Sequence, residues 1–259
     1  MQGLPLSIPV ADGNVHQALR FGDMVAGAPL VLHLHGGAFV SAPPAGHTTV
    51  AARLLVEAGA CVVSLHYPLA PAHPFPAALD AAYASLLHLR RACPAPLLVA
   101  GEEAGGNLAA GVARMARDRQ EPALAGQILC SALLSPLLAT HSQRRAELGF
   151  AGSAMERGWR VYASQPCDGS HPYAAPAHAL RLEGLAPAWL LTARDDPFRN
   201  EARAYARRLS KHGIKATLVC LPPPSRFPAA YQDDEAVRAP WMDLARESLR
   251  SFLAAVVRS

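Results

Sequence analysis

The sequence predicts one α/β domain built on a doubly wound, mostly parallel β-sheet flanked by helices. Short, continuous apolar runs rich in β-branched residues alternate with helix-like stretches, as in sheets covered on both faces. The chain has 259 residues, 51% of them hydrophobic and 17% charged, which suits a large globular domain with a well-buried core. We therefore expect a single domain over residues 1–259.

Six strands and five helices account for most of the chain. The strands are expected at residues 30–35, 61–66, 97–101, 127–134, 188–193 and 216–221. Helices are expected near 45–58, 78–92, 105–118, 200–212 and 240–257. Because such sheets bind ligands beyond the carboxyl ends of their strands, the residues that directly follow each strand are the candidate site residues.

One long segment interrupts the alternation. Residues 138–180 carry His, Arg, Gly and Pro with only short helical fragments, and they follow the fourth strand. Inserted residues at that place would lie over the carboxyl edge of the sheet as a lid. We expect cap elements here and in about residues 1–25.

The third strand runs directly into a helix through a glycine-rich turn. Gly101, Gly105 and Gly106 permit a sharp turn and close helix–strand packing, which predicts a nucleophile elbow with Glu103 at the nucleophile position. Upstream, the run from His35 to Phe39, HGGAF, directly follows a strand. It matches a loop that donates backbone N–H groups to an oxyanion hole. The expected hole residues are Gly36, Gly37, Ala38 and, from the elbow, Ala104.

These motifs form an ordered set that resembles the bacterial hormone-sensitive-lipase family of carboxylesterases, which have the α/β-hydrolase fold. HGGAFV resembles that family's HGGG(F/W) loop, and GEEAGGNLAA resembles its GDSAGGNLAA. Residues 65–86 resemble its YRLAPE-HPFPAALDD segment, and HPYAAP at 171–176 resembles DPYASP. Residues 193–209 resemble the stretch around DPLRDE, which places the family's acid at Asp196. The resemblance covers most of residues 30–230. It implies a short cap, since the family usually carries a longer N-terminal one.

The sequence departs from the family at two catalytic positions. Glu103 stands in place of the nucleophilic serine, and Ser225 stands where the catalytic histidine is expected. No Gly-x-Ser-x-Gly occurs elsewhere, and His212, at a helix end, is the only histidine after Asp196. Serine attack needs a hydroxyl, a base and an orienting carboxylate. Ordinary Ser-His-Asp ester hydrolysis is therefore predicted to be absent.

Three roles are open for Glu103. At a helix N-terminus it would face the N–H groups of the oxyanion hole, with a lowered pKa, and block the hole with its own charge. It could be a nucleophile, as aspartate is in other branches of the fold, but those enzymes also need the missing histidine. It could act with Asp196 as a general acid or base in a lyase, isomerase or cyclase reaction.

The remaining pocket candidates surround these positions. Arg226 could bridge Glu103 and Asp196 or face solvent, and Glu102 is expected to be a structural hydrogen-bond partner. His35, Phe39 and Phe227 complete the expected pocket. His33 and His35 share a strand face, but no third ligand is evident, so we expect no metal. The stretch 101–106 is neither a P-loop nor GxGxxG, and we expect no cofactor.

Charge and targeting signals restrict the partners. The net charge is +4, but the basic residues are spread along the expected helices, so no nucleic-acid partner is predicted. No apolar run is long enough to span a membrane, and the N-terminus lacks a signal-peptide pattern. Five scattered cysteines indicate free thiols in a reducing cytoplasm.

The leading functional hypothesis is a non-hydrolytic member of the esterase family. It would bind a small apolar or acyl-bearing ligand, or a protein partner, at the old active-site cleft. The same broad family includes plant gibberellin receptors, which have lost the histidine. The alternatives are a repurposed enzyme and a structural subunit of a larger assembly. By resemblance, a homodimer could form through residues 215–221 and 240–257.

Overall fold

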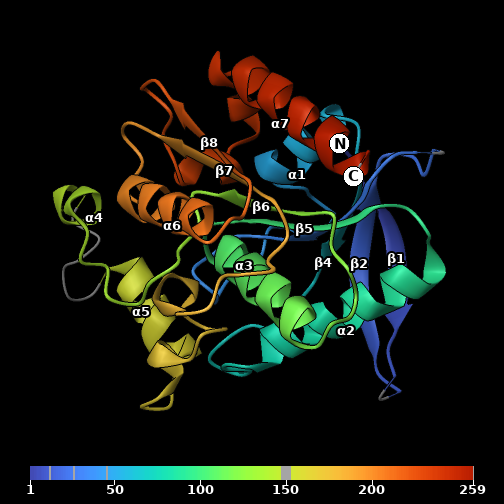
Figure 1. Cartoon of the computed structure of the whole chain (residues 1–259), viewed down its shortest axis with the longest axis horizontal. Coiled ribbons are helices and arrows are strands. Elements are labelled where there is room, and N and C mark those ends of the chain that lie inside the picture. Colours follow the sequence, from blue (N-terminus) through green and yellow to red (C-terminus); the bar gives the residue numbers. More distant parts are fainter. Residues whose placement is uncertain (12, 26, 45, 147–152, 259) are drawn as a thin grey trace.

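An eight-stranded sheet forms the centre of the protein in a computed structural model that describes residues 1–258 except 12, 26, 45 and 147–152 (Figure 1). The strand order is β1-β2-β4-β3-β5-β6-β7-β8. All neighbouring pairs from β4 to β8 are parallel, whereas β1 and β2 join the sheet antiparallel. The strands are β1 Leu4–Pro9, β2 Val15–Phe21, β3 Leu30–Leu34, β4 Cys61–Leu65, β5 Leu97–Glu102, β6 Gly126–Cys130, β7 Ala188–Ala193 and β8 Ala216–Leu221.

The six expected strands all form, and the predicted mostly parallel sheet flanked by helices is confirmed. The expectation of cap elements in about residues 1–25 is wrong, because this segment supplies β1 and β2 instead. Leu4, Leu6 and Ile8 share one face of β1, and their burial increases along the strand from exposed at Leu4 to fully buried at Ile8, so this face enters the core at its carboxyl end.

Helices cover both faces of the sheet (Figure 1). The helices are α1 Val50–Glu57, α2 Ala77–Ala92, α3 Glu103–Asp118, α4 His141–Arg145, α5 Ala154–Tyr162, α6 Arg199–Lys211 and α7 Trp241–Val257. The side chains of α1 and α7 share one hydrophobic cluster, and those of α2, α3 and α6 share the other. The Thr49 hydroxyl accepts the Ala52 N–H at 3.2 Å, so α1 begins at Val50, later than expected.

Glycines let α3 approach the sheet closely. A Cβ on Gly105 would lie 1.9 Å from the carbonyl oxygen of Leu34, at the end of β3. A Cβ on Gly106 would lie 2.7 Å from the Cβ of Ala132, just after β6. The N-terminus of α3 is therefore fixed at the carboxyl ends of the central strands, where the candidate site residues meet.

The segment 138–180 contains α4, α5 and two short 3-10 turns, Asp168–Ser170 and Pro176–His178. Part of the expected lid, residues 147–152, lies outside the described residues. Among the residues that the structure describes, no helix combines the length and apolar character needed to cross a membrane.

Candidate active site

The sharp turn expected between β5 and α3 is present. The strand ends at Glu102, and the helix starts at Glu103, whose φ of 53° lies in the left-handed region. Non-glycine residues adopt this conformation rarely, and it raises the side chain of the first helical residue above the sheet edge. A Cβ on Gly101 would lie 2.3 Å from the Gly105 carbonyl oxygen, so the turn tolerates no side chain there.

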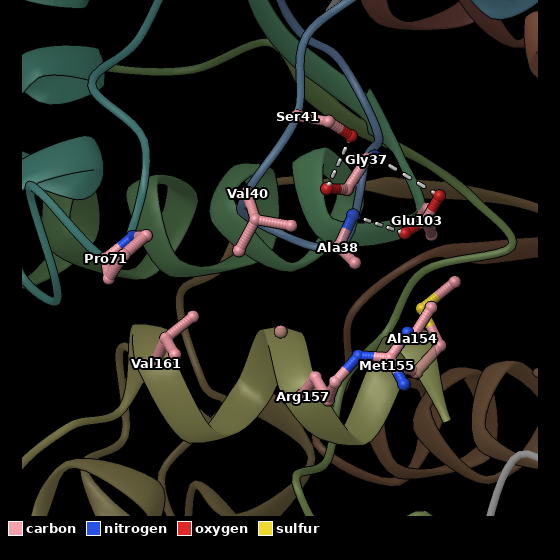
Figure 2. Close-up of a pocket in the computed structure, with 11 residues that line it drawn as sticks. Gly37, Ala38, Val40, Ser41, Pro71, Glu103, Ala154, Met155, Arg157 and Val161 are labelled. Carbon is pink, nitrogen blue, oxygen red and sulfur yellow. Dashed lines mark hydrogen bonds between the residues drawn. The ribbon is translucent and has the colours of Figure 1, made fainter. Parts of the chain in front are cut away.

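The Glu103 carboxylate binds the glycine-rich loop that follows β3 (Figure 2). Its Oε1 accepts the Ala38 N–H at 2.7 Å, and its Oε2 accepts the Gly37 N–H at 3.3 Å. The loop is held in an unusual conformation, with φ of 119° at Gly37 and 50° at Ala38. The expected third donor, the N–H of Ala104, makes no hydrogen bond to this carboxylate among the described residues.

The pKa of Glu103 differs from the expectation. The N–H donors of the hole and a helix N-terminus were expected to lower it, but burial raises it to about 7. Glu103 is 7% exposed, and removing its carboxylate from water disfavours the charged form more than the two hydrogen bonds favour it. The negative charge of the adjacent Glu102 adds to the upward shift.

Glu102 is a buried structural hydrogen-bond partner. Its Oε1 accepts the Gly36 N–H at 2.9 Å, and its Oε2 lies 2.7 Å from Nε2 of His33. His33 is fixed in turn by Ser64, whose Oγ lies 3.0 Å from Nδ1. Burial alone would raise the pKa of Glu102, but His33 and the Gly36 N–H outweigh it, and the pKa is lowered.

The two aromatic side chains of the loop lie beneath it and do not line the pocket. The His35 ring stacks on Tyr67 with centroids 4.3 Å apart, and Tyr67 donates its hydroxyl to the His35 carbonyl at 2.7 Å. Burial lowers the pKa of His35 to about 4, so its ring is neutral near pH 7. Phe39 stacks on Tyr162 of α5 with centroids 4.0 Å apart.

At the expected histidine position, the serine contacts Asp195 and not Asp196, the residue at the family's acid position. Ser225 donates its Oγ–H and its backbone N–H to the two carboxylate oxygens of Asp195, each at 2.8 Å. Asp196 is 1% exposed and accepts hydrogen bonds from Ser131 at 2.8 Å and Thr192 at 2.6 Å. The sequence pattern alone gave no reason to single out Asp195.

Arg226 and Phe227 lie away from Glu103. The Arg226 guanidinium is 67% exposed and pairs with Asp233 at 2.9 Å, so the hypothesis of a bridge between Glu103 and Asp196 is wrong. Phe227 packs in the core, with its ring centroid 4.7 Å from Tyr231 and 4.9 Å from Trp241. In the loop after β8, the Phe227 side chain therefore points into the core and the Arg226 side chain points to solvent.

The pocket above Glu103 lies between the loop after β3 and helix α5 (Figure 2). It has a volume of about 400 Å³, and among the lining residues that the structure describes Glu103 is the one acidic residue. The helix approaches the loop so closely that a Cβ on Gly158 would lie 2.2 Å from the Ala38 carbonyl oxygen. The lining residues of the pocket are mostly apolar: Gly37, Ala38, Val40, Ser41, Pro71, Glu103, Ala154, Met155, Arg157, Gly158 and Val161.

The arrangement brings some of the expected residues together and separates others. Gly37, Ala38 and Glu103 line this pocket, whereas Asp196 lines a second one with Asp195. Within the described residues, no group of three or more His, Cys, Asp or Glu side chains is placed to hold a metal ion.

Comparison with known proteins gives one family and many esterases. The family described as having the alpha/beta hydrolase fold matches residues 31–223. Esterase LipI of Mycobacterium tuberculosis is 35% identical over 199 residues, which are 73% of this chain and 62% of that protein. Ethyl acetate hydrolase of Pseudomonas putida is 31% identical over 231 residues, covering 84% of this chain and 72% of that protein. The chain spans about three fifths of the first curated relatives that it matches.

Solved structures agree with the sequence relatives. EstE1, a thermophilic carboxylesterase cloned from a metagenomic library, superposes with a TM-score of 0.80 at 33% identity and covers 97% of this chain and 89% of that one. A hyperthermophilic esterase from the archaeon Pyrobaculum calidifontis gives a TM-score of 0.78 at 32% identity. It covers 98% of this chain and 85% of that chain.

Proposed function

This chain belongs to the α/β-hydrolase family and is a homologue of hormone-sensitive-lipase-type carboxylesterases, and we propose that it binds a ligand in the former catalytic pocket without Ser-His ester hydrolysis. Relatives such as LipI are named esterases. We propose a different activity for this chain. By the family resemblance, esterase chemistry depends on a serine and a histidine at two positions that are Glu103 and Ser225 here.

The observation that carries the proposal is the contact between Glu103 and the loop. An oxyanion hole works when its N–H donors are open to the oxygen that gains charge in the transition state. Here the N–H groups of Gly37 and Ala38 already bind the carboxylate of the same chain. A substrate carbonyl would have to displace that carboxylate before it could be polarised, and no hydroxyl stands at the elbow to attack it.

The pocket supports a small apolar or acyl-bearing ligand. Val40, Pro71, Met155 and Val161 give it apolar walls, and its volume of about 400 Å³ falls in the ordinary range for small-molecule sites. A protein partner inserting one side chain would use the same walls.

The reducing cytoplasm stays our proposal for the compartment.

A double substitution tests the proposal. Glu103→Ser with Ser225→His, assayed on a short p-nitrophenyl ester, should raise hydrolysis about 100-fold or more above the wild type. The single Glu103→Ser variant is the matched control and should stay near the wild-type rate, because the base is still missing. Wild-type turnover at ordinary esterase rates would refute the proposal.

A second candidate function is favoured by one observation. The pKa of Glu103 is raised to about 7, which suits a general acid or base at neutral pH. Asp196 would not assist it from the same pocket, because it lines a different one. Turnover of a candidate substrate that disappears in Glu103→Gln, with the fold retained, would establish this enzyme function in place of the receptor-like one.

Self-association stays a proposal from the family resemblance. Strand β8 is an edge strand with partly exposed apolar residues, and it lies beside α7 at a hollow of about 290 Å³. A second copy pairing there, or a larger assembly that uses the chain as a structural subunit, would cover this edge. Light scattering of the purified protein distinguishes a dimer from a monomer.

A further inference from the structure

A second hollow with a cationic wall lies beside the expected histidine position. It has a volume of about 440 Å³ and lies between α4, the loop after β7 and the start of α6. We call it the arginine pocket. Its wall includes Ser142, Arg145, Arg194, Asp195, Asp196 and Arg199.

The two aspartates of the arginine pocket are committed to other partners. Both oxygens of Asp195 accept hydrogen bonds from Ser225, at 2.8 Å each. Oδ2 of Asp196 accepts hydrogen bonds from the Ser131 hydroxyl at 2.8 Å and the Thr192 hydroxyl at 2.6 Å. Its Oδ1 accepts the backbone N–H of Phe198 at 2.8 Å. Neither carboxylate forms an ion pair with an arginine among the described residues.

The three arginines differ in what they bind. Arg199 donates Nη1–H to the Arg194 carbonyl at 2.5 Å, which fixes the turn after β7. In the part of the chain that the structure describes, the guanidinium groups of Arg145 and Arg194 have neither a carboxylate oxygen within 4.0 Å nor another hydrogen-bond acceptor. Both side chains are exposed at the mouth of the hollow.

We propose that the arginine pocket binds the oxyanion group of a small molecule, a phosphate or a carboxylate. Planar guanidinium groups donate paired N–H bonds that match both anions, and two arginines on different elements can hold one group from two sides. The three guanidinium groups of the wall outnumber its two carboxylates, so positive charge remains in excess, and the carboxylates of Asp195 and Asp196 bind neutral donors and not these arginines.

The arginine pocket is distinct from the pocket above Glu103. The two share no lining residue, so an anion bound by Arg145 and Arg194 would not touch Glu103. The arginine pocket lies instead beside Asp195, the partner of Ser225. A binding site here therefore adds a recognition element that the function proposed for Glu103 does not require.

The test is an NMR titration of the full chain at low ionic strength with inorganic phosphate and, separately, with acetate. At least one anion should give saturable one-site binding, and Arg145→Gln with Arg194→Gln should weaken it about tenfold or more. Arg203→Gln is the matched control, because Arg203 is exposed on the same helix as Arg199 but does not line the hollow. Its affinity should stay within about twofold of the wild type.

Phosphate binding without acetate binding would identify a phosphate group, and the reverse would identify a carboxylate. Three results would overturn the proposal: neither anion saturating a site, the double variant binding like the wild type, or Arg203→Gln weakening binding as strongly as the double variant. Glu103→Ser should leave anion binding unchanged, so failure here is distinguishable from failure of the function proposed for the Glu103 pocket.

Discussion

The Oε1 atom of Glu103 lies 2.7 Å from the backbone nitrogen of Ala38. Together with the bonds from Gly37 to Glu103 and from Gly36 to Glu102, this contact places three consecutive backbone N–H groups on two carboxylates. The loop that would stabilise a substrate oxyanion in an esterase is thus occupied by side chains of its own chain.

Stability should fall as the pH rises toward neutral, in part because of Glu103. Its folded-state pKa is about 7, above the ordinary value of 4.5, so the folded protein holds its proton more tightly than the unfolded chain does. The associated stability is fully present below about pH 4.5 and is lost as the pH rises through about 7, a difference on the order of 3 kcal/mol.

Urea unfolding of the wild type and Glu103→Gln at several pH values measures this effect. Between roughly pH 5 and 8, the free energy of unfolding of the variant should fall less steeply than that of the wild type. Some slope should remain, because burial also raises the pKa of Glu201 to about 7. Identical slopes in the two proteins would show that Glu103 is ionised throughout.

Removing His33 should destabilise the fold strongly. His33→Ala leaves the fully buried Glu102 carboxylate without its 2.7 Å partner, and breaking a buried pair costs about 3–5 kcal/mol. His212→Ala is the matched control. It removes a histidine that lies 2.6 Å from Glu183 at the surface, where solvent screens the pair and a far smaller loss is expected. Equal losses in chemical denaturation would contradict this account of the Glu102 site.

A methyl group at Gly158 should force α5 away from the loop. The added Cβ would lie 2.2 Å from the Ala38 carbonyl oxygen, so backbone must move, and the cost should be about 1–3 kcal/mol although alanine favours helix. Gly169→Ala is the control, since its nearest neighbour would be Pro136 Cγ at 3.7 Å. Thermal melting compares the two variants, and a Gly158→Ala protein as stable as the control would show that the helix moves freely.

Arg226→Ala should change the free energy of unfolding by no more than about 0.5 kcal/mol. The Arg226 side chain is 67% exposed and its partner Asp233 is only half-buried, so solvent screens the pair. Denaturation measured beside the wild type checks this. A loss above about 2 kcal/mol would revive the buried bridge to Glu103 and Asp196 that the structure does not contain.

The sequence predicted the parallel core of the fold well because those strands carry a strong local signal. Continuous apolar runs such as 188–193 and 216–221 gave β7 and β8 with their observed bounds. The first two strands were missed, since β1 contains two prolines and β2 mixes polar with apolar residues. The alternation of Leu4, Leu6 and Ile8 was the available signal, but it is short.

The candidate site was predictable where it depends on backbone turns and not where it depends on side-chain direction. Glycine spacing located the elbow and the loop, and both the left-handed Glu103 and the bond to Ala38 follow from them. Two outcomes needed the folded structure: burial outweighs hydrogen bonding in the pKa of Glu103, and Ser225 turns to Asp195 and not to Asp196. Residue order alone does not fix which of two adjacent aspartates faces a neighbouring loop.

The carboxylates that hold Gly36, Gly37 and Ala38 also govern how this loop exchanges with solvent. An irregular surface loop ordinarily exchanges its amide hydrogens with deuterium quickly, because no partner must open first. Here each of the three amides has an acceptor: two are the carboxylate oxygens of Glu103 at the elbow, and the third belongs to its fully buried neighbour Glu102. The loop should therefore exchange on the slow timescale of the central strands, and its protection should decrease selectively in a chain where Glu103 is shortened.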